Sequence, residues 1–398
     1  MKILSFGCRL NTFESKIIEK ELADQDDVFV INTCAVTSEA ERQCRQTIRR
    51  VARENPEMKI IVTGCAAQLN PSFYADMKEV HKIVGNIEKL EKDKLLFGPK
   101  IQVSDISKVN QTVPIVSDFE ERTRAFLQIQ QGCDHACTFC IVHKARGKNK
   151  GLEPDLVIDE AKAFVQKGFK ELVLTGVDIA SYPFDLNKLL LRIQKEVKGL
   201  ARLRLGSFDP ALMTDNFIDV FKESEMMMPH LHLSMQAGDD MILKRMGRRH
   251  STSFVSEACH KLINIRKDFV FGADMIAGFP TETDDMFLNS LQFVKEVPIS
   301  LLHVFPYSVR PGTPAGKMPQ VDMPIRKERA ARLREIGNRL LALKMKEYEG
   351  KQLNVLVEKQ GRGYSENYLK VKTNSTKTGE IVSVLIEKRE NDELVGKI

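Results

Sequence analysis

Short apolar runs alternate with longer stretches of helical periodicity along the first 98 residues of the chain. Runs of this kind are typical of buried strands, whereas apolar residues that recur every three or four positions are typical of amphipathic helices. The pattern predicts strands at 2–6, 27–32, 59–63 and 81–84, with helices at 12–22 and 38–53. Strands and helices that alternate in this order form a parallel sheet covered by helices. We therefore predict an α/β domain over residues 1–98.

A second series of strands and helices follows a linker predicted at 99–123, where the periodicity fades into polar sequence containing prolines. Over residues 124–322 the pattern predicts six strands, at 125–130, 171–175, 202–206, 230–235, 270–276 and 301–306. Six strand–helix units form a partial (β/α)6 barrel, because a full barrel needs eight strands. Functional residues in such barrels lie at the C-terminal ends of the strands.

The last part of the chain changes character twice. Residues 323–350 predict one long charged helix, which presents Leu333, Ile336, Leu340 and Leu343 on one face. Residues 351–398 turn to short strands, predicted at 353–357, 368–371 and 381–386 and separated by glycine-containing turns. A segment of this length and pattern predicts a small β-barrel.

Three cysteines directly follow the first strand of the predicted barrel. Cys133, Cys137 and Cys140 have the spacing C-x3-C-x2-C, which brings three thiolates together on one loop. A structural zinc site takes four protein ligands, and iron–sulfur clusters are usually held by four thiolates. Three thiolates therefore indicate a 4Fe-4S cluster with one iron open to a substrate or cofactor. The alternatives are a structural zinc loop and buried free thiols.

Three further cysteines occupy equivalent places in the N-terminal domain. Cys8, Cys34 and Cys65 each follow one of its first three strands. Because the carboxyl ends of parallel strands share one edge of the sheet, these side chains are expected to converge there. We interpret them as a second metal site, with three buried thiols as the alternative. Asn11 and Asn32 either line the same pocket or form turns and helix caps.

Composition limits the class of protein. With 398 residues, 42% hydrophobic and 29% charged, the chain is expected to form two or three globular domains. It has neither an apolar run long enough for a membrane span nor a signal-peptide core, so we expect a cytoplasmic protein. Cysteines there are more often ligands or free thiols than disulfides, and Cys44 and Cys259, in helix-like stretches, are assigned to packing. The net charge of +6 permits an acidic partner such as RNA.

The cysteine loop, with Phe139 before its last cysteine, resembles the loop of radical S-adenosylmethionine (SAM) enzymes, whose open iron binds SAM. The segment Ile141–Gly147 and the three upstream cysteines narrow the resemblance to the methylthiotransferases, over essentially the whole chain. This resemblance implies two 4Fe-4S clusters, one on each cysteine triad, a radical-SAM barrel of six strands and a C-terminal RNA-binding barrel of the TRAM type.

The resemblance also implies SAM contacts at Gly176, Ser207 and Gln236, each just after a predicted barrel strand. Residues of these types also occur in any loop, so each has a purely structural alternative. We assign His135, inside the cysteine loop, to the surface. The alternatives are an extra metal ligand and a hydrogen-bond donor to one of the ligands.

Basic and aromatic residues provide candidate RNA contacts. We predict these at Lys144, Arg146, Lys148, Arg248, Arg249, Tyr364 and Tyr368. The alternatives are a solvated cationic loop for the basic residues and simple packing for the two tyrosines.

The activity implied by the resemblance is transfer of a methylthio group to C2 of N6-threonylcarbamoyladenosine at position 37 of tRNA, with two SAM consumed per product. Its motifs include the start Phe6–Asn11 and the late segment His303–Ser308. The alternatives are methylthiolation of N6-isopentenyladenosine or of a ribosomal-protein aspartate, and a non-enzymatic iron–sulfur protein that binds RNA or carries electrons. Expected partners are the tRNA anticodon stem-loop and an electron donor such as flavodoxin or ferredoxin, with the chain as a monomer.

Overall fold

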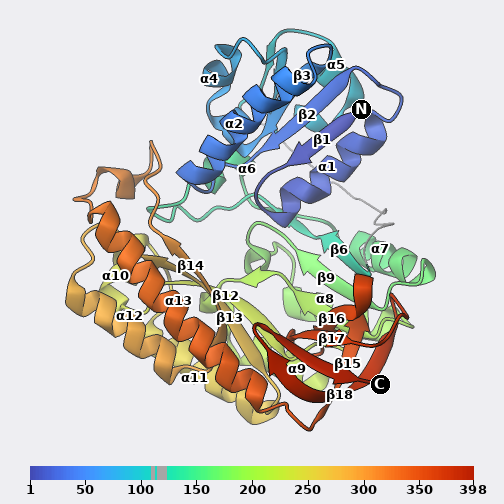
Figure 1. The fold of residues 1–398 in the computed structure, drawn as a ribbon, viewed down its shortest axis with the longest axis vertical. Helices are drawn as coiled ribbons and strands as arrows, with labels where there is room; N and C mark the ends of the chain where they lie inside the picture. The colour runs from blue at the N-terminus through green and yellow to red at the C-terminus, as the bar shows by residue number, and fades with distance from the viewer. Residues whose placement is uncertain (109–112, 114–122) are drawn as a thin grey trace. The chain divides into compact units, whose positions relative to one another are not determined.

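In the computed structural model, which describes residues 1–108, 113 and 123–398, the N-terminal strands form one parallel sheet in the order β1-β2-β3-β4-β5 (Figure 1). The strands are β1 (Lys2–Ser5), β2 (Val28–Thr33), β3 (Lys59–Gly64), β4 (Lys82–Val84) and β5 (Ile101–Gln102). All six residues of β2 are buried, as expected for a central strand covered on both faces. The four predicted strands are confirmed, and β5 extends the sheet into the segment predicted as a linker. The remainder of that linker lies largely outside the described residues.

Helices follow the strands as the periodicity predicted. The longest are α1 (Arg9–Glu21) and α2 (Ser38–Glu54). Thr37 caps α2 by accepting a hydrogen bond from the backbone N–H of Ala40, and Cys44, Ile48 and Val51 form its buried face. Shorter helices are α3 (Cys65–Leu69), α4 (Pro71–Ala75) and α5 (Lys92–Leu96).

This sheet belongs to a compact unit made of Met1–Asp118, Gln130–Leu152 and Ser308–Lys317. The cysteine loop at 133–140 is therefore part of the same unit as the N-terminal sheet, although the sequence places it in the barrel domain. The loop is followed by α6 (Val142–Arg146) and enclosed by a small antiparallel pair, β7 (Gln130–Gln131) with β8 (Lys150–Gly151).

The second unit, Phe119–Ile129, Glu153–Tyr307 and Met318–Ile398, contains the barrel strands. They are β6 (Arg124–Gln128), β9 (Glu171–Thr175), β10 (Arg202–Leu205), β11 (Ser207–Phe208), β12 (His230–Gln236), β13 (Val270–Ala277) and β14 (Ile299–Pro306). Parallel pairing gives two sheets, β10-β9-β6 and β11-β12-β13-β14, and only Gly206 separates β10 from β11 along the chain. The six predicted strands are thus confirmed. The helices between them are α7 (Pro154–Gln166), α8 (Leu186–Glu196), α9 (Asp215–Glu223), α10 (Asp240–Met246), α11 (Thr252–Ile265) and α12 (Asp284–Glu296).

The long helix α13 (Met323–Lys346) packs against β14, but not through the full face that was predicted. Its buried residues include Ala330, Leu333 and Gly337, whereas Leu343 is 55% exposed. A Cβ at position 337 would lie 2.9 Å from the Cβ of Leu302, so glycine there allows close approach of helix and strand. The prediction that Leu343 belongs to the packed face is wrong.

The C-terminal segment is a closed barrel in the order β15-β16-β17-β19-β18 (Figure 1). Its strands are β15 (Gln352–Val357), β16 (Arg362–Ser365), β17 (Lys370–Thr373), β18 (Ile381–Glu390) and β19 (Glu393–Lys397). The predicted small barrel is confirmed. The sequence pattern missed β16 and β19, since glycines in these two strands, Gly363 and Gly396, lie where a Cβ would clash with the neighbouring strand.

Candidate metal centres

The first cysteine triad lies at the carboxyl edge of the N-terminal sheet. Cys8 precedes α1, Cys34 follows β2 and Cys65 begins α3. A Cβ on Gly7, where φ is +91°, would lie 2.5 Å from Sγ of Cys34. The turn after β1 therefore passes directly over the Cys34 side chain, which brings the chain at Cys8 beside it. This is the convergence predicted from the strand ends.

The surroundings of this triad disfavour isolated thiolates. The pKa of the Cys34 thiol is raised to about 12, mainly by burial and to a smaller extent by negative charge on Cys65 and Cys8, while the hydrogen bond from the N–H of Val36 opposes the rise. A metal centre supplies positive charge that holds such thiolates in the ionised form. Three cysteines at one edge of the sheet, with Cys34 and Cys65 buried, therefore fit an iron–sulfur cluster with one iron left open.

Both triads share a local backbone geometry. The N–H two residues after a cysteine lies 3.4 Å from its Sγ in three places, Val36 to Cys34, His135 to Cys133 and Val142 to Cys140. Hydrogen bonds from amides to sulfur stabilise cluster-bound thiolates and tune the reduction potential of the cluster. The donor set and its backbone environment thus fit iron–sulfur ligation at both triads.

The C-x3-C-x2-C loop is held in shape by its own flanks. Gly132 has φ +72°, and a Cβ there would overlap the carbonyl oxygen of Lys148. Gln130 Nε2 donates to the carbonyl of Gly132 and to Oδ1 of Asn149, both at 2.7 Å. Cys133 N–H donates to the carbonyl of Gly147 at 3.0 Å. Of the three cysteines, Cys137 is buried and the others are half-buried, as is His135.

Arg146 is buried beside the first triad, which corrects its predicted role as an RNA contact. Its residue is 2% exposed, its Nε donates to Sγ of Cys65 at 3.2 Å, and its Nη atoms donate to Glu14 and Asn11. Asn11 in turn donates to the carbonyls of Phe6 and Thr33, and Asn32 donates to the carbonyl of Asn11. Both asparagines therefore line the edge that carries the cysteines while they also fix its turns.

The three predicted SAM contacts lie at the C-terminal ends of barrel strands. Gly176 follows β9, exposed Ser207 lies two residues after the end of β10, where β11 begins, and Gln236 ends β12. Gln236 has φ +71°, and the register between β12 and β13 shifts just before it. A positive φ is costly for a non-glycine residue and is found most often at functional sites. This geometry supports a role for Gln236, and the SAM contacts remain predictions.

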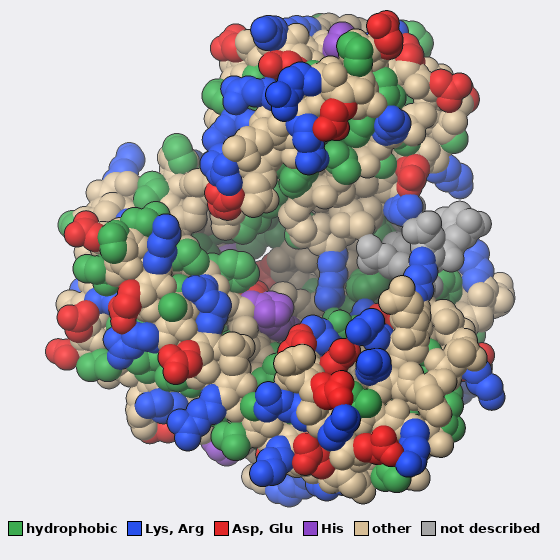
Figure 2. Space-filling model, viewed as in Figure 1, with side chains coloured by type: hydrophobic (Ala, Val, Ile, Leu, Met, Phe, Trp, Pro, Cys, Tyr) green, Lys and Arg blue, Asp and Glu red, His purple; other side chains and the backbone are tan. Residues whose placement is uncertain are grey.

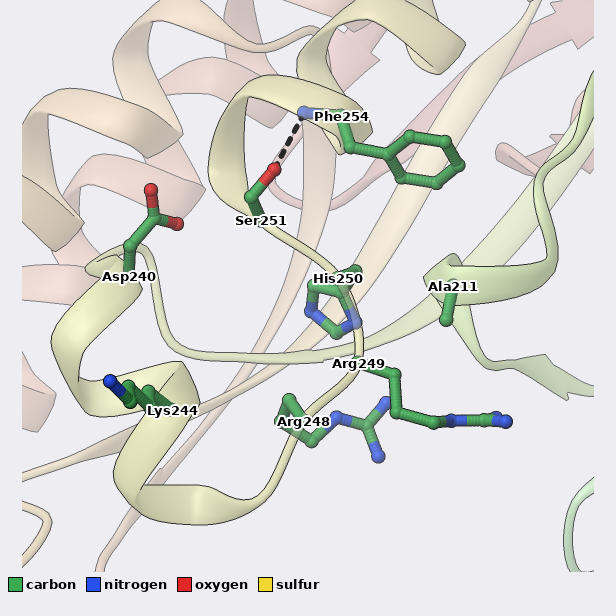
Figure 3. A pocket seen from close by; sticks show the side chains of 8 residues that line it. All are labelled: Ala211, Asp240, Lys244, Arg248, Arg249, His250, Ser251 and Phe254. Carbon is green, nitrogen blue, oxygen red and sulfur yellow. Dashed lines mark hydrogen bonds between the residues drawn. The ribbon is translucent and has the colours of Figure 1, made fainter.

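The basic residues at 244–250 surround a cavity of about 590 Å³ on the second unit (Figure 3). Lys244 comes from α10, whereas Arg248, Arg249 and His250 come from the segment that joins α10 to α11. The Arg248 side chain is 8% exposed and donates to Asp209 and to the carbonyl of Ser234, and its contact with RNA stays a prediction. Arg249 also pairs with Asp209 but stays 43% exposed.

Tyr364 and Tyr368 are half-buried, which favours the alternative that they pack within the protein. Their rings stack with centroids 4.7 Å apart, and Tyr368 also stacks on His230 at 4.4 Å. The Arg124 guanidinium lies 4.6 Å from the Tyr364 ring centroid. The two tyrosines therefore join the small barrel to the strands of its own unit. Lys144 and Lys148 are exposed, as predicted.

A basic surface on α2 was not predicted from the sequence. Five of the six arginines among residues 1–108 lie on this helix. Arg42, Arg49, Arg50 and Arg53 are exposed, and the guanidinium of Arg45 lies 5.7 Å from the Phe73 ring centroid. Figure 2 shows basic side chains gathered over α2. The sequence contained a signal for this surface, because several arginines recur on the polar side of the predicted helix, which has only a narrow apolar stripe.

A polar cluster lies on one face of β12, β13 and β14. His232 and Asp274 alternate with buried apolar neighbours, and His303 follows half-buried Leu302, so the three polar residues share the face opposite to Leu302 and α13. Burial alone would raise the pKa of Asp274, but hydrogen bonds with His232 and His303 hold it well below its usual value. Asp274 is therefore an ionised carboxylate at neutral pH.

Two protein families match this chain. The Radical SAM superfamily matches residues 127–294, and a family described as "Uncharacterized protein family UPF0004" matches residues 1–85. The fold is similar to that of the radical SAM methyltransferase TsrM from Kitasatospora setae, with a TM-score of 0.55 over 77% of this chain and 69% of that chain, at 14% identity. The fold and the cysteine loop together define a radical SAM protein.

Full-length relatives narrow the class further. The chain is 48% identical to the threonylcarbamoyladenosine tRNA methylthiotransferase MtaB of Rickettsia prowazekii, over 93% of this chain and 90% of that protein. It is 35% identical to MtaB of Bacillus subtilis, over 96% of this chain and 93% of that protein. It is 31% identical to a tRNA-2-methylthio-N(6)-dimethylallyladenosine synthase of Thermoanaerobacter, over 100% of this chain and 88% of that protein. The chain belongs to the radical SAM methylthiotransferase family, as a tRNA methylthiotransferase of the MtaB type.

The family assignment confirms several predictions. It confirms that the protein is an enzyme, and it implies SAM, iron–sulfur cofactors and a tRNA substrate.

Cys44 and Cys259 are fully buried in α2 and α11, consistent with packing. Across the described part of the chain, no helix combines the length and apolarity needed to cross a bilayer.

Proposed function

We propose that this enzyme transfers a methylthio group to C2 of N6-threonylcarbamoyladenosine at position 37 of tRNA. The observation that carries the proposal is the presence of two cysteine triads in one compact unit, each one sulfur short of a complete 4Fe-4S site. A second support is the 48% identity to a relative named for this nucleoside.

An aromatic C–H bond is too unreactive for acid–base chemistry by protein side chains, so the cofactors must supply the reactivity. When bound, two clusters and two SAM molecules per product supply a carbon-centred radical and a methylated sulfur. Cys133, Cys137 and Cys140 would hold one cluster, and Cys8, Cys34 and Cys65 the other. The residues of this chain bind and orient these groups, with Gly176, Ser207 and Gln236 proposed for SAM.

The polar face formed by His232, Asp274 and His303 supports the threonylcarbamoyl substrate. A threonylcarbamoyl group carries a carboxylate, a hydroxyl and amides, whereas a dimethylallyl group is apolar. A site built to hydrogen-bond a polar substituent rejects an analogue that lacks it. A face with two imidazoles and a carboxylate therefore suits the polar substituent better, and we assign the recognition of that substituent to this face.

For tRNA binding we propose the exposed arginines of α2 together with Lys144, Lys148 and Arg249. Exposed cations contact phosphates without reading sequence, so they would position the anticodon stem-loop while the modified base enters the site. We further propose a monomer in the cytoplasm that receives electrons from a small carrier such as flavodoxin or ferredoxin.

The test uses two anticodon stem-loops that differ only in the modification at position 37, threonylcarbamoyladenosine or isopentenyladenosine. The reconstituted enzyme with SAM and a reductant is expected to give the 2-methylthio product, identified by nucleoside mass spectrometry, only with the first. Product from isopentenyladenosine alone would move the enzyme to that substrate. Formation of 5′-deoxyadenosine without either nucleoside product would point to the ribosomal-protein aspartate.

A further inference from the structure

Arg146 belongs to a buried ion cluster with an excess of positive charge. The side chains of Arg146, Lys89 and Glu14 are at most 1% exposed. Lys89 Nζ donates to Glu14 Oε2 at 2.6 Å, and Arg146 Nη2 donates to the same oxygen at 2.9 Å. With both bases protonated, two cations against one carboxylate leave one positive charge in the interior, and burial and the charge of Arg146 accordingly lower the pKa of Lys89. Such a charge is strongly unfavourable unless an anion lies beside it.

The excess charge is directed at the first cysteine triad. Arg146 Nε lies 3.2 Å from Sγ of Cys65, and Nδ2 of Asn86 lies 3.9 Å from the same sulfur. Asn86 is oriented by Lys89, which donates to its Oδ1 at 2.7 Å. A cluster-bound thiolate at Cys65 would supply the anion that balances this charge. The guanidinium of Arg146 is charged at any physiological pH.

Arg146 also connects the two cysteine motifs along the chain. It is the last residue of α6, six residues after Cys140, while Glu14 lies on α1, shortly after Cys8. Asn86 donates to the carbonyl of Ala145 at 2.8 Å, which fixes the end of α6 against the sheet. The segment that carries Cys133, Cys137 and Cys140 is thereby connected by hydrogen bonds to Cys65 of the first triad.

We propose that Arg146 is a positioning residue that raises the reduction potential of the cluster held by Cys8, Cys34 and Cys65. The inference rests on the proposed two-cluster function. An N–H donor and a positive charge at a ligating sulfur stabilise the reduced form, which carries one more negative charge. Glu14 acts in the opposite sense, because it neutralises one of the two cations.

The alternative is that Arg146 has only a structural role and holds α6 against α1 and α3. Charge changes of opposite sign separate the two roles. Arg146→Gln removes a positive charge beside the sulfur, and Glu14→Gln removes the opposing negative charge. A tuning role predicts shifts of the reduction potential in opposite directions, whereas a purely structural role predicts loss of stability in both variants without that pattern.

The experiment isolates the first cluster in full-length protein in which Cys133, Cys137 and Cys140 are changed to alanine. After anaerobic reconstitution, iron content is measured and the cluster is titrated with dithionite under spectroscopic monitoring. Arg146→Gln is expected to shift the midpoint potential to a more negative value and Glu14→Gln to a more positive one. Lys144→Gln, a cation two residues away whose Nζ contacts the carbonyl of Gly312, is the control and should leave the potential unchanged.

Unchanged potentials, or shifts of the same sign, in variants with full iron content would overturn the proposal. If Arg146→Gln does not retain the cluster, Lys89→Gln removes the same charge without touching the sulfur and must give a smaller negative shift, and no shift would overturn the proposal. A triple-alanine background that binds no iron–sulfur cluster would instead contradict the two-cluster function. The two failures are therefore distinguishable.

Discussion

His232 on β12 and Asp274 on β13 meet across neighbouring strands, with Nε2 of the histidine 3.0 Å from Oδ1 of the carboxylate. The same oxygen lies 3.4 Å from Nδ1 of His303 on β14. Gly272, the register partner of His232, makes this possible, because a Cβ there would lie 2.4 Å from Nδ1 of the imidazole. One ionised carboxylate thus orients two imidazoles on the face assigned to the threonylcarbamoyl group.

Asp274→Asn should weaken substrate discrimination. Loss of a charge-assisted hydrogen bond costs about 1.5–3 kcal/mol, so kcat/KM for the threonylcarbamoyl stem-loop should fall roughly 10- to 100-fold. Binding of the unmodified stem-loop should change little. The control is Asp285→Asn on the exposed side of α12, which should behave as the wild type. Equal weakening with both stem-loops would show that Asp274 serves the fold and not recognition.

Gly7→Ala should prevent assembly of the first cluster. Its Cβ would collide with Sγ of Cys34, and its φ of +91° is unfavourable for alanine. Gly168→Ala is a matched control, since its φ is +92° but nothing lies within 4 Å of the added Cβ. Both variants should lose about 1–3 kcal/mol of stability from the backbone. Only Gly7→Ala should lose the iron of the first triad, as measured by iron and sulfide analysis, and full iron content in this variant would contradict the site geometry.

Substitution of the arginines on α2 should reduce tRNA affinity in a salt-dependent way. Changing Arg49, Arg50 and Arg53 to glutamine removes three exposed cations, so the slope of log K against log salt should fall by about one for each phosphate that these side chains neutralise. Arg192→Gln is the control, because this half-buried arginine is already paired with Asp155 and Glu196. An unchanged slope in the triple variant would place the RNA on another surface.

Asp209→Asn should destabilise the second unit in a pH-dependent way. Burial would raise the pKa of Asp209, but His250, Arg248, Arg249 and the N–H of Ala211 hold it well below its usual value. Because the pKa is lower in the folded protein, the carboxylate stabilises the fold above its unfolded pKa of about 4, and this contribution is lost as the pH falls through the folded value.

The expected loss at pH 7 is about 3 kcal/mol in urea unfolding, since the buried arginine would lack its partner. The difference from wild type should shrink as the pH is lowered below about 4. Asp215→Asn is the control, because the carboxylate of Asp215 is exposed and pairs with Lys261 at the surface. Its expected effect is below about 1 kcal/mol. A difference that stays constant with pH would show that the charge of Asp209 is not responsible.

Local pattern determined the elements of this protein and the location of its cysteines. The strands at 28–33 and 171–175 are buried along their whole length, which explains why their sequences are rich in apolar residues and could be recognised. Parallel strands bring the residues at their carboxyl ends to one edge of the sheet. That Cys8, Cys34 and Cys65 lie at one edge of the sheet could therefore be predicted, because each of them follows a predicted parallel strand. Gly363 and Gly396 concealed two strands, because their small size reflects contacts with neighbouring strands that the sequence does not record.

Only the tertiary structure decided the roles of the charged residues. By sequence, Arg146 and Lys144 are equal members of one basic run, yet one is buried against Cys65 and the other is exposed. The difference depends on Glu14, which is 132 residues away along the chain. A hydrophobic period reports which way a helix or strand faces, whereas the partner of a charge is set by packing between distant segments. That is why the two cysteine triads could be predicted from the sequence, whereas the contact of Arg146 with Cys65 could not.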